Sequence, residues 1–108
     1  MRILLIEADA QLREKIALVL HSGGGYEVTQ ASSSQQAVAL LLGQQFDLAV
    51  GRASVISQLP VQLPRIGFGA APDELPPYSL GWIESLQPLP GFAEQVRQLW
   101  QQHSKKHQ

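Results

Sequence analysis

A short apolar run at the start of the chain, closed by acids, constrains the fold more than any other feature. Residues 3–6 are all Ile or Leu, and Glu7-Ala8-Asp9 follows them directly. Such a run is typical of a strand that is buried on both faces, as strands inside parallel sheets are. The acids would then lie at the carboxyl end of the strand, where open α/β sheets bind their ligands. We therefore expect an α/β fold with its functional site beside Glu7 and Asp9.

Strand-like and helix-like segments alternate through the rest of the first half. Residues 10–21 carry apolar side chains at helical spacing, and residues 26–30 alternate as a strand does. Residues 32–34 can cap a second amphipathic helix, which runs through Leu42 and which Gly43 ends, and residues 46–51 form a third strand. Because strands and helices alternate at this spacing, we predict right-handed crossovers and a parallel sheet.

The second half is dominated by proline. All seven prolines lie between residues 60 and 90. Proline removes a backbone donor and clashes with the preceding helical turn, so long helices are not expected there. Residues 65–68 and 80–83 can form two short strands, whose connections hold one or two helical turns at most. The predicted fold class is therefore a three-layer α/β fold with a five-stranded parallel sheet, in which the third and fourth helices are reduced or missing.

Composition limits the possible functions. A chain of 108 residues is large enough for one domain. We place this domain over residues 1–103 and expect residues 104–108 to be a disordered tail. With a net charge of −1 and no cysteine, the chain has no basic field for nucleic acid, no disulfide and no thiolate zinc site. Since neither a signal peptide nor a membrane span is recognisable, we expect a cytoplasmic protein without nucleic-acid or membrane contacts.

Four segments of the first half together resemble a known family. They are MRILLIEAD at residues 1–9, GYEV at 25–28, SQQAVALL at 34–41 and FDLAV at 46–50. In this order they resemble the receiver domain of two-component response regulators, which has the CheY-like, flavodoxin-like fold. The resemblance implies a parallel sheet in the strand order 2-1-3-4-5 with flanking helices, and a role in signal transduction or transcription regulation.

The chemistry that this resemblance implies is phosphoryl transfer. In the family, a histidine kinase phosphorylates an aspartate at the end of the third strand. Two acids after the first strand hold magnesium, while a Thr or Ser after the fourth strand and a Lys after the fifth contact the phosphate. Such chemistry needs a carboxylate nucleophile, a cation that neutralises charge, and donors for the phosphoryl oxygens.

Most of these groups are replaced in this sequence. Glu7-Ala8-Asp9 lacks one of the metal-binding acids, and Arg52 stands at the phosphoacceptor position. Gly69 takes the place of the Thr or Ser, and Gln87 takes the place of the Lys. The resemblance therefore implies a degenerate phosphorylation pocket, that is, a pseudo-receiver. We predict no catalytic residue, no metal site, no cofactor and no enzymatic activity.

Arg52 would change the electrostatics of this pocket. A guanidinium beside carboxylates forms charge-assisted hydrogen bonds and disfavours a divalent cation. We expect an ion pair from Arg52 to Glu7 or Asp9 that holds the pocket in one state. Three alternatives remain: Arg52 points into solvent, Glu7 or Asp9 is an unorthodox phosphoacceptor, or the crevice between the three residues binds a small ligand.

Loss of two helices would leave apolar surface near one edge of the sheet. In the family, the fourth helix, the fifth strand and the last helix form the output face, and here APDELPPYS at residues 71–79 replaces the fourth helix. Apolar and aromatic side chains anchor interfaces. We predict that the domain docks a signalling or regulatory protein, or a second copy as a homodimer, unless the loops bury these side chains within the monomer. The predicted interface residues are Phe68, Tyr78, Trp82, Leu86 and Leu89.

Overall fold

One parallel sheet runs through the computed structural model, which describes residues 1–59 and 62–106. Its strands are β1 (Arg2–Ile6), β2 (Glu27–Ala31), β3 (Leu48–Gly51), β4 (Arg65–Phe68) and β5 (Ser79–Ile83). They pair in the order β2-β1-β3-β4-β5, and every pair is parallel. The predicted fold class and strand order are confirmed.

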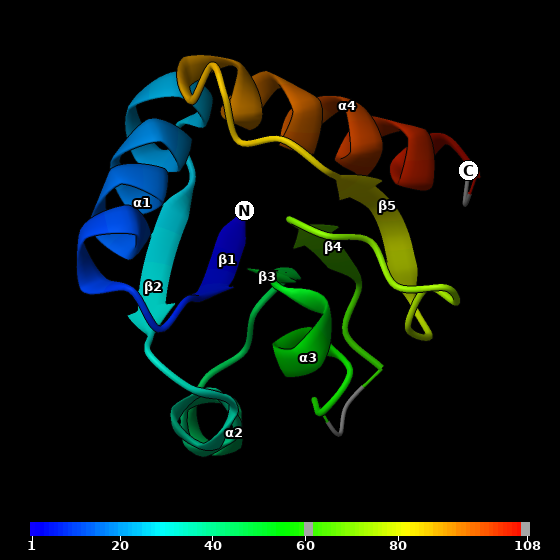
Figure 1. Cartoon of the computed structure of the whole chain (residues 1–108). Coiled ribbons are helices and arrows are strands. Elements are labelled where there is room, and N and C mark those ends of the chain that lie inside the picture. The colour runs from blue at the N-terminus through cyan, green and yellow to red at the C-terminus, as the bar shows by residue number, and fades with distance from the viewer. Residues whose placement is uncertain (60–61, 107–108) are drawn as a thin grey trace.

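Helices cover both faces of this sheet. They are α1 (Ala10–Gly24), α2 (Ser34–Gly43), α3 (Ala53–Ile56) and α4 (Pro90–Lys106). Figure 1 shows α1 and α4 on one side of the sheet and α2 and α3 on the other. The predicted reduction is confirmed, because α3 is a single turn and residues 69–78, between β4 and β5, contain no helix. The last helix continues to Lys106, past the boundary expected at residue 103, while residues 107–108 of the predicted tail lie outside the described residues.

Local side chains fix where the helices begin and end. Asp9 caps α1, since its carboxylate accepts hydrogen bonds from the backbone N–H groups of Gln11 and Leu12. Gly25 ends the helix with a left-handed φ of 69°, a conformation that glycine adopts without steric cost. Ser33 caps α2 in the same way as Asp9 caps α1. These contacts satisfy backbone groups that would otherwise lack partners at the helix ends.

The two faces of β1 belong to two apolar cores. Ile3 and Leu5 pack in the core beneath α1 and α4, while Leu4 and Ile6 pack in the core on the α2 and α3 side. Successive side chains of a strand point to opposite faces, so a continuous apolar run fills both cores. No helix in the described part of the chain is both long and apolar enough to cross a membrane.

A buried arginine donates a hydrogen bond to the C-terminal end of the short helix α3. Arg65, at the start of β4, is only 2 % exposed. Its Nη1 atom donates to the carbonyl oxygen of Ile56 at 2.6 Å, and its Nε atom donates to that of Leu63 at 2.9 Å. The Ile56 carbonyl lies at the end of α3, where it also accepts a longer hydrogen bond from the Leu59 N–H at 3.4 Å. Arg65 therefore links the end of α3 to the segment that leads into β4.

Candidate functional site

Glu7 and Arg52 form an ion pair at the carboxyl ends of β1 and β3. Ile6 lies opposite Gly51 in the sheet, so the residues that follow them leave adjacent strands side by side. The Nε atom of Arg52 lies 2.9 Å from Oε2 of Glu7. The Glu7 side chain is 6 % exposed and that of Arg52 is 46 % exposed. A nearly buried carboxylate thus receives its counter-charge from a half-exposed guanidinium, and Arg52 does not simply point into solvent.

The Arg52 guanidinium has two further neighbours. Its Cζ atom lies 5.1 Å from the centre of the Phe68 ring, within the range of a cation–π contact. Gly69 lies against it with a left-handed φ of 87°, and a Cβ atom on Gly69 would come within 2.8 Å of Arg52 Nη1. The carbonyl oxygen of Gly69 accepts a hydrogen bond from Trp82 Nε1 at 2.9 Å. A hydroxyl side chain at position 69 would therefore meet both an unfavourable backbone conformation and the guanidinium.

Asp9 and Arg13 bind to backbone groups beside this pair. Oδ1 of Asp9 accepts from the N–H groups of Gln11 and Leu12 at 3.0 and 3.2 Å, so this carboxylate serves as the cap of α1. Arg13 donates from Nη1 to the carbonyl oxygen of Glu7 at 2.8 Å. The sequence pattern did not single out Arg13, although its place one turn into α1 allows a long side chain to reach back to Glu7.

The residues at this edge do not fit the magnesium ion that the receiver fold implies. Magnesium requires oxygen ligands in near-octahedral geometry, usually including carboxylates. Here Glu7 is paired with Arg52, Asp9 caps a helix, and β3 is followed by a cation. Across residues 1–59 and 62–106, no group of three or more His, Cys, Asp and Glu side chains is placed to hold a metal. The guanidinium supplies the positive charge next to Glu7.

Two other residues lie outside this cluster of contacts. Gln87 is exposed before α4, where its backbone N–H and carbonyl groups hydrogen-bond with the Ser85 hydroxyl. Asp47 lies at the amino end of β3, where its carboxylate accepts the backbone N–H of Arg2 at 2.8 Å. Asp47 is therefore at the opposite end of the strand from Arg52.

The residues predicted for an interface differ in their exposure. The prediction for Phe68 is wrong, because its side chain is fully buried and packs edge-on against the ring of Phe92. It lies on β4, a strand that is buried on both faces. Trp82, Leu86 and Leu89 are half-buried, whereas Tyr78 is 50 % exposed. The prediction of an interface stays open for these four.

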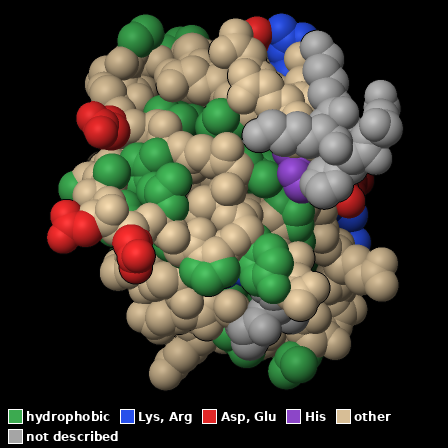
Figure 2. All heavy atoms as spheres, turned by 90° about the vertical axis from the view of Figure 1, so that its right-hand side faces the viewer, with side chains coloured by type: hydrophobic (Ala, Val, Ile, Leu, Met, Phe, Trp, Pro, Cys, Tyr) green, Lys and Arg blue, Asp and Glu red, His purple; other side chains and the backbone are tan. Residues whose placement is uncertain are grey.

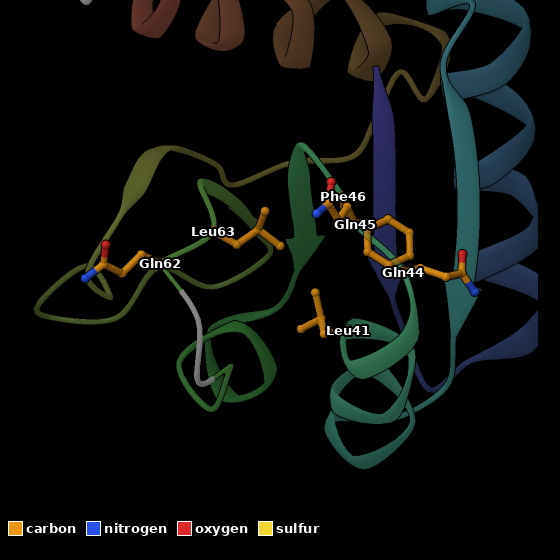
Figure 3. Close-up of a pocket in the computed structure, with 6 residues that line it drawn as sticks. All are labelled: Leu41, Gln44, Gln45, Phe46, Gln62 and Leu63. Carbon is orange, nitrogen blue, oxygen red and sulfur yellow. The ribbon is translucent and has the colours of Figure 1, made fainter.

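A groove of about 300 Å³ opens near the amino ends of β3 and β4. In Figure 3, Leu41, Phe46 and Leu63 point toward one another across it, while the amides of Gln44 and Gln62 point away. Its polar side chains therefore do not converge on a common point, and nothing in its lining selects a ligand.

Comparisons with known proteins bear on the fold. No protein-family model matches the sequence, and no curated protein matches it. Among solved structures, a two-component response regulator from Clostridium difficile has a TM-score of 0.76 at 13 % identity, over 94 % of this chain and 96 % of that chain.

Two further solved structures are similar over nearly the whole chain. A CheY-like receiver domain protein from Methanospirillum hungatei has a TM-score of 0.69 at 18 % identity, over 96 % of this chain and 97 % of that chain. The response regulator protein TrrA from Thermotoga maritima, in complex with Mg²⁺-BeF, has a TM-score of 0.72 at 18 % identity, over 91 % of this chain and 97 % of that chain. The chain therefore has the fold of the CheY-like response regulator receiver domains.

Proposed function

We propose that this chain is a receiver-like protein-interaction module of signal transduction or transcription regulation that takes no part in phosphotransfer. The observation that carries the proposal is the ion pair between Arg52, which directly follows β3, and Glu7. We expect the module to act in the cytoplasm, without enzymatic activity and without direct contact with nucleic acid or membrane.

Arg52 supports this proposal because of its chemistry. A guanidinium is always protonated in proteins and has no acceptor, so it cannot act as the nucleophile of phosphoryl transfer. Its positive charge also opposes the binding of a divalent cation next to Glu7. Arg52 therefore both replaces the phosphoacceptor carboxylate and opposes the binding of the metal ion that receiver chemistry needs.

The packing of Arg52 supports an output that does not depend on phosphorylation. The guanidinium donates to Glu7 and lies against the Phe68 ring. It also occupies the space that a side chain at position 69 would need. A ligand shifts a conformational equilibrium only when it binds two states differently. With this pocket filled by the protein's own ion pair, the binding of a partner protein takes the place of phosphorylation as the controlling event.

The alternative of an unorthodox phosphoacceptor is less well supported. The Glu7 carboxylate is nearly buried and paired with Arg52. The Asp9 carboxylate accepts two backbone hydrogen bonds as the cap of α1. Phosphorylation of either acid would first have to break these contacts.

Magnesium titration followed by amide NMR tests the proposal. We expect no shift of the resonances of residues 7–9 and 52 in wild-type protein at millimolar magnesium. Arg52→Asp places a carboxylate after β3, and the resonances of these residues should shift in this variant under the same conditions. Arg52→Gln serves as the control that removes the positive charge without adding a carboxylate. A saturable shift in the wild-type protein would overturn the proposal.

A further inference from the structure

We propose that an extended basic segment of a partner protein, carrying a large apolar residue, binds along β5 and the β4–β5 connection. This inference rests on the proposed function, because it identifies the chemistry of the partner. The surface, called here the β5 surface, consists of the outer edge of β5 together with Asp73, Glu74, Leu75, Tyr78 and Glu84.

The β5 strand is at an edge of the sheet. The strand order places β4 on one side of it and no strand on the other side among the described residues. Residues Ser79–Ile83 contain neither a charge nor a proline, the features that commonly protect an edge strand from pairing. The irregularity in its pairing lies at Arg65/Ile66, and Gly81, Trp82 and Ile83 are in regular register with β4. The outer edge can therefore accept another extended segment.

Apolar side chains lie next to this edge. Leu75 and Tyr78 are each 50 % exposed, and Leu80 and Trp82 of β5 are half-buried. Figure 2 shows this face, with hydrophobic side chains gathered beside acidic ones along one margin. A partner side chain placed here would contact aromatic and aliphatic groups of the kind that anchor interfaces.

Tyr78 is held in a fixed position. It has a φ of 67°, which is rare for a residue with a side chain and persists only where the surroundings enforce it. The Ser79 N–H and hydroxyl both donate to the carbonyl oxygen of Pro76, and the Tyr78 ring lies 5.8 Å from the buried Arg65 guanidinium. Such preorganisation lowers the entropic cost of binding.

The charge of this part of the chain selects a basic partner. Residues 66–93 contain Asp73, Glu74 and Glu84 but no Lys or Arg, whereas the rest of the chain has eight basic and six acidic residues, among them the paired Glu94 and Arg97. Arg65 is buried and so does little to neutralise the β5 surface. Asp73, Glu74 and Glu84 are exposed, and they would attract Lys or Arg on the partner.

The same charges argue against a second copy of this chain as the occupant. In a twofold-symmetric dimer each partner presents the same patch, so the acids of one copy would face those of the other. Like charges brought together at an interface are unfavourable. The observations therefore favour a different protein over a homodimer at this surface.

A matched set of three labelled peptides tests the inference. The peptides share a central Leu and differ only in whether Arg, Gln or Glu flanks it, and fluorescence anisotropy measures their binding to the full chain. We expect the Arg peptide to bind about tenfold or more tightly than the Gln peptide, with weaker binding at high salt, and the Glu peptide to bind least. Tyr78→Ser and the double variant Asp73→Asn/Glu74→Gln should each lower the affinity for the Arg peptide several-fold.

Glu27→Gln provides the matched control, because Glu27 is an exposed acid on β2, the strand at the other edge of the sheet. It should leave binding unchanged, and circular dichroism should show that every variant is folded. Equal binding of the three peptides, or equal losses in Glu27→Gln and the β5-surface variants, would overturn the inference. Light scattering that shows a dimer lost in Tyr78→Ser would also overturn it, in favour of a second copy. None of these outcomes bears on Arg52, so the inference and the proposed function can fail separately.

Discussion

Arg52 donates a hydrogen bond from its Nε atom to Oε2 of Glu7 at 2.9 Å, joining the carboxyl ends of β3 and β1. Open α/β sheets bind their ligands at this end of the strands. Here the protein's own ion pair fills the position, with Phe68 beneath the guanidinium and Gly69 beside it. A fold like that of receiver domains thus carries an ion pair at this end of its sheet.

The ion pair should contribute to stability. Arg52→Ala leaves the nearly buried Glu7 carboxylate without its counter-charge and with only the Asp9 N–H as a donor, so we expect the free energy of unfolding to fall by about 1–3 kcal/mol. Urea denaturation followed by circular dichroism measures this change.

A double variant separates the ion pair from the packing of Arg52. Glu7→Gln removes the charge that Arg52→Ala leaves unpaired, so the double variant should lose less stability than the two single losses added together. Simple additivity of the two losses would show that the pair contributes nothing.

The packing of the Trp82 ring should require glycine at position 67. A Cβ atom on Gly67 would overlap the six-membered ring of Trp82, whose Nε1 bonds Gly69. We expect Gly67→Ala to displace the indole, to change its fluorescence in a Trp100→Phe background, and to cost about 1–3 kcal/mol. Gly43→Ala is the control, since Gly43 has nothing within 4 Å of its added Cβ and ends α2. A Gly67→Ala protein as stable as Gly43→Ala would contradict this account of the packing.

Arg65 should not be replaceable by lysine. Its guanidinium donates to two carbonyl oxygens from two different nitrogens, which a single ammonium group does not reproduce at the same geometry. Burial lowers the pKa of this guanidinium, because a charged group loses hydration inside the protein. We expect Arg65→Lys to lose about 1–3 kcal/mol in urea denaturation. The exposed Arg97→Lys should change stability by less than about 0.5 kcal/mol, and an equal loss in both variants would count against this role of Arg65.

Stability should decline at alkaline pH in a manner that depends on Tyr26. Burial raises the pKa of the Tyr26 phenol above its ordinary value of about 10, although Arg97 opposes the shift. The folded state therefore keeps a proton that the unfolded state has lost. The associated stability is complete below the unfolded pKa and is lost as the pH rises through the folded pKa.

Urea denaturation between pH 9 and 11, about one unit on either side of the ordinary tyrosine pKa, checks this dependence. Tyr26→Phe should lose less stability than the wild type as the pH rises, by at most about 1.4 kcal/mol per pH unit, the limit for one proton. Tyr78→Phe is the control variant: it retains Tyr26, so the loss of stability that Tyr26 causes at alkaline pH should remain. Parallel curves for wild type and Tyr26→Phe would show that the phenol does not titrate differently in the two states.

The parallel sheet could be predicted because the first half of the chain repeats a strong pattern, whereas its strand order was implied only by the resemblance to receiver domains. Residues 3–6 are apolar without interruption, and β1 is indeed buried on both faces. The prolines likewise indicated that the later helices are short, because proline removes backbone donors wherever it occurs. Both signals are local in the sequence, so no knowledge of the packing was needed.

The details of the site depend on contacts between distant residues, and these were harder to predict. Phe68 was expected at a surface, but a short strand that is buried on both faces gives no alternation from which its direction could be read. The reach of Arg13 to Glu7 depends on side-chain rotamers, which periodicity does not encode. The left-handed conformation of Tyr78 also has no local sequence signal, since glycine is the usual residue there.

The central claim is that this pocket does not accept a phosphoryl group. Wild-type protein and Arg52→Asp should be incubated with acetyl phosphate and magnesium, beside a phosphorylatable receiver domain that shows the donor to be active, and their intact masses measured at neutral pH. We predict that the wild-type chain keeps its original mass. The account would be contradicted if the wild-type chain gained the mass of one phosphoryl group and the Glu7→Gln or Asp9→Asn variant did not.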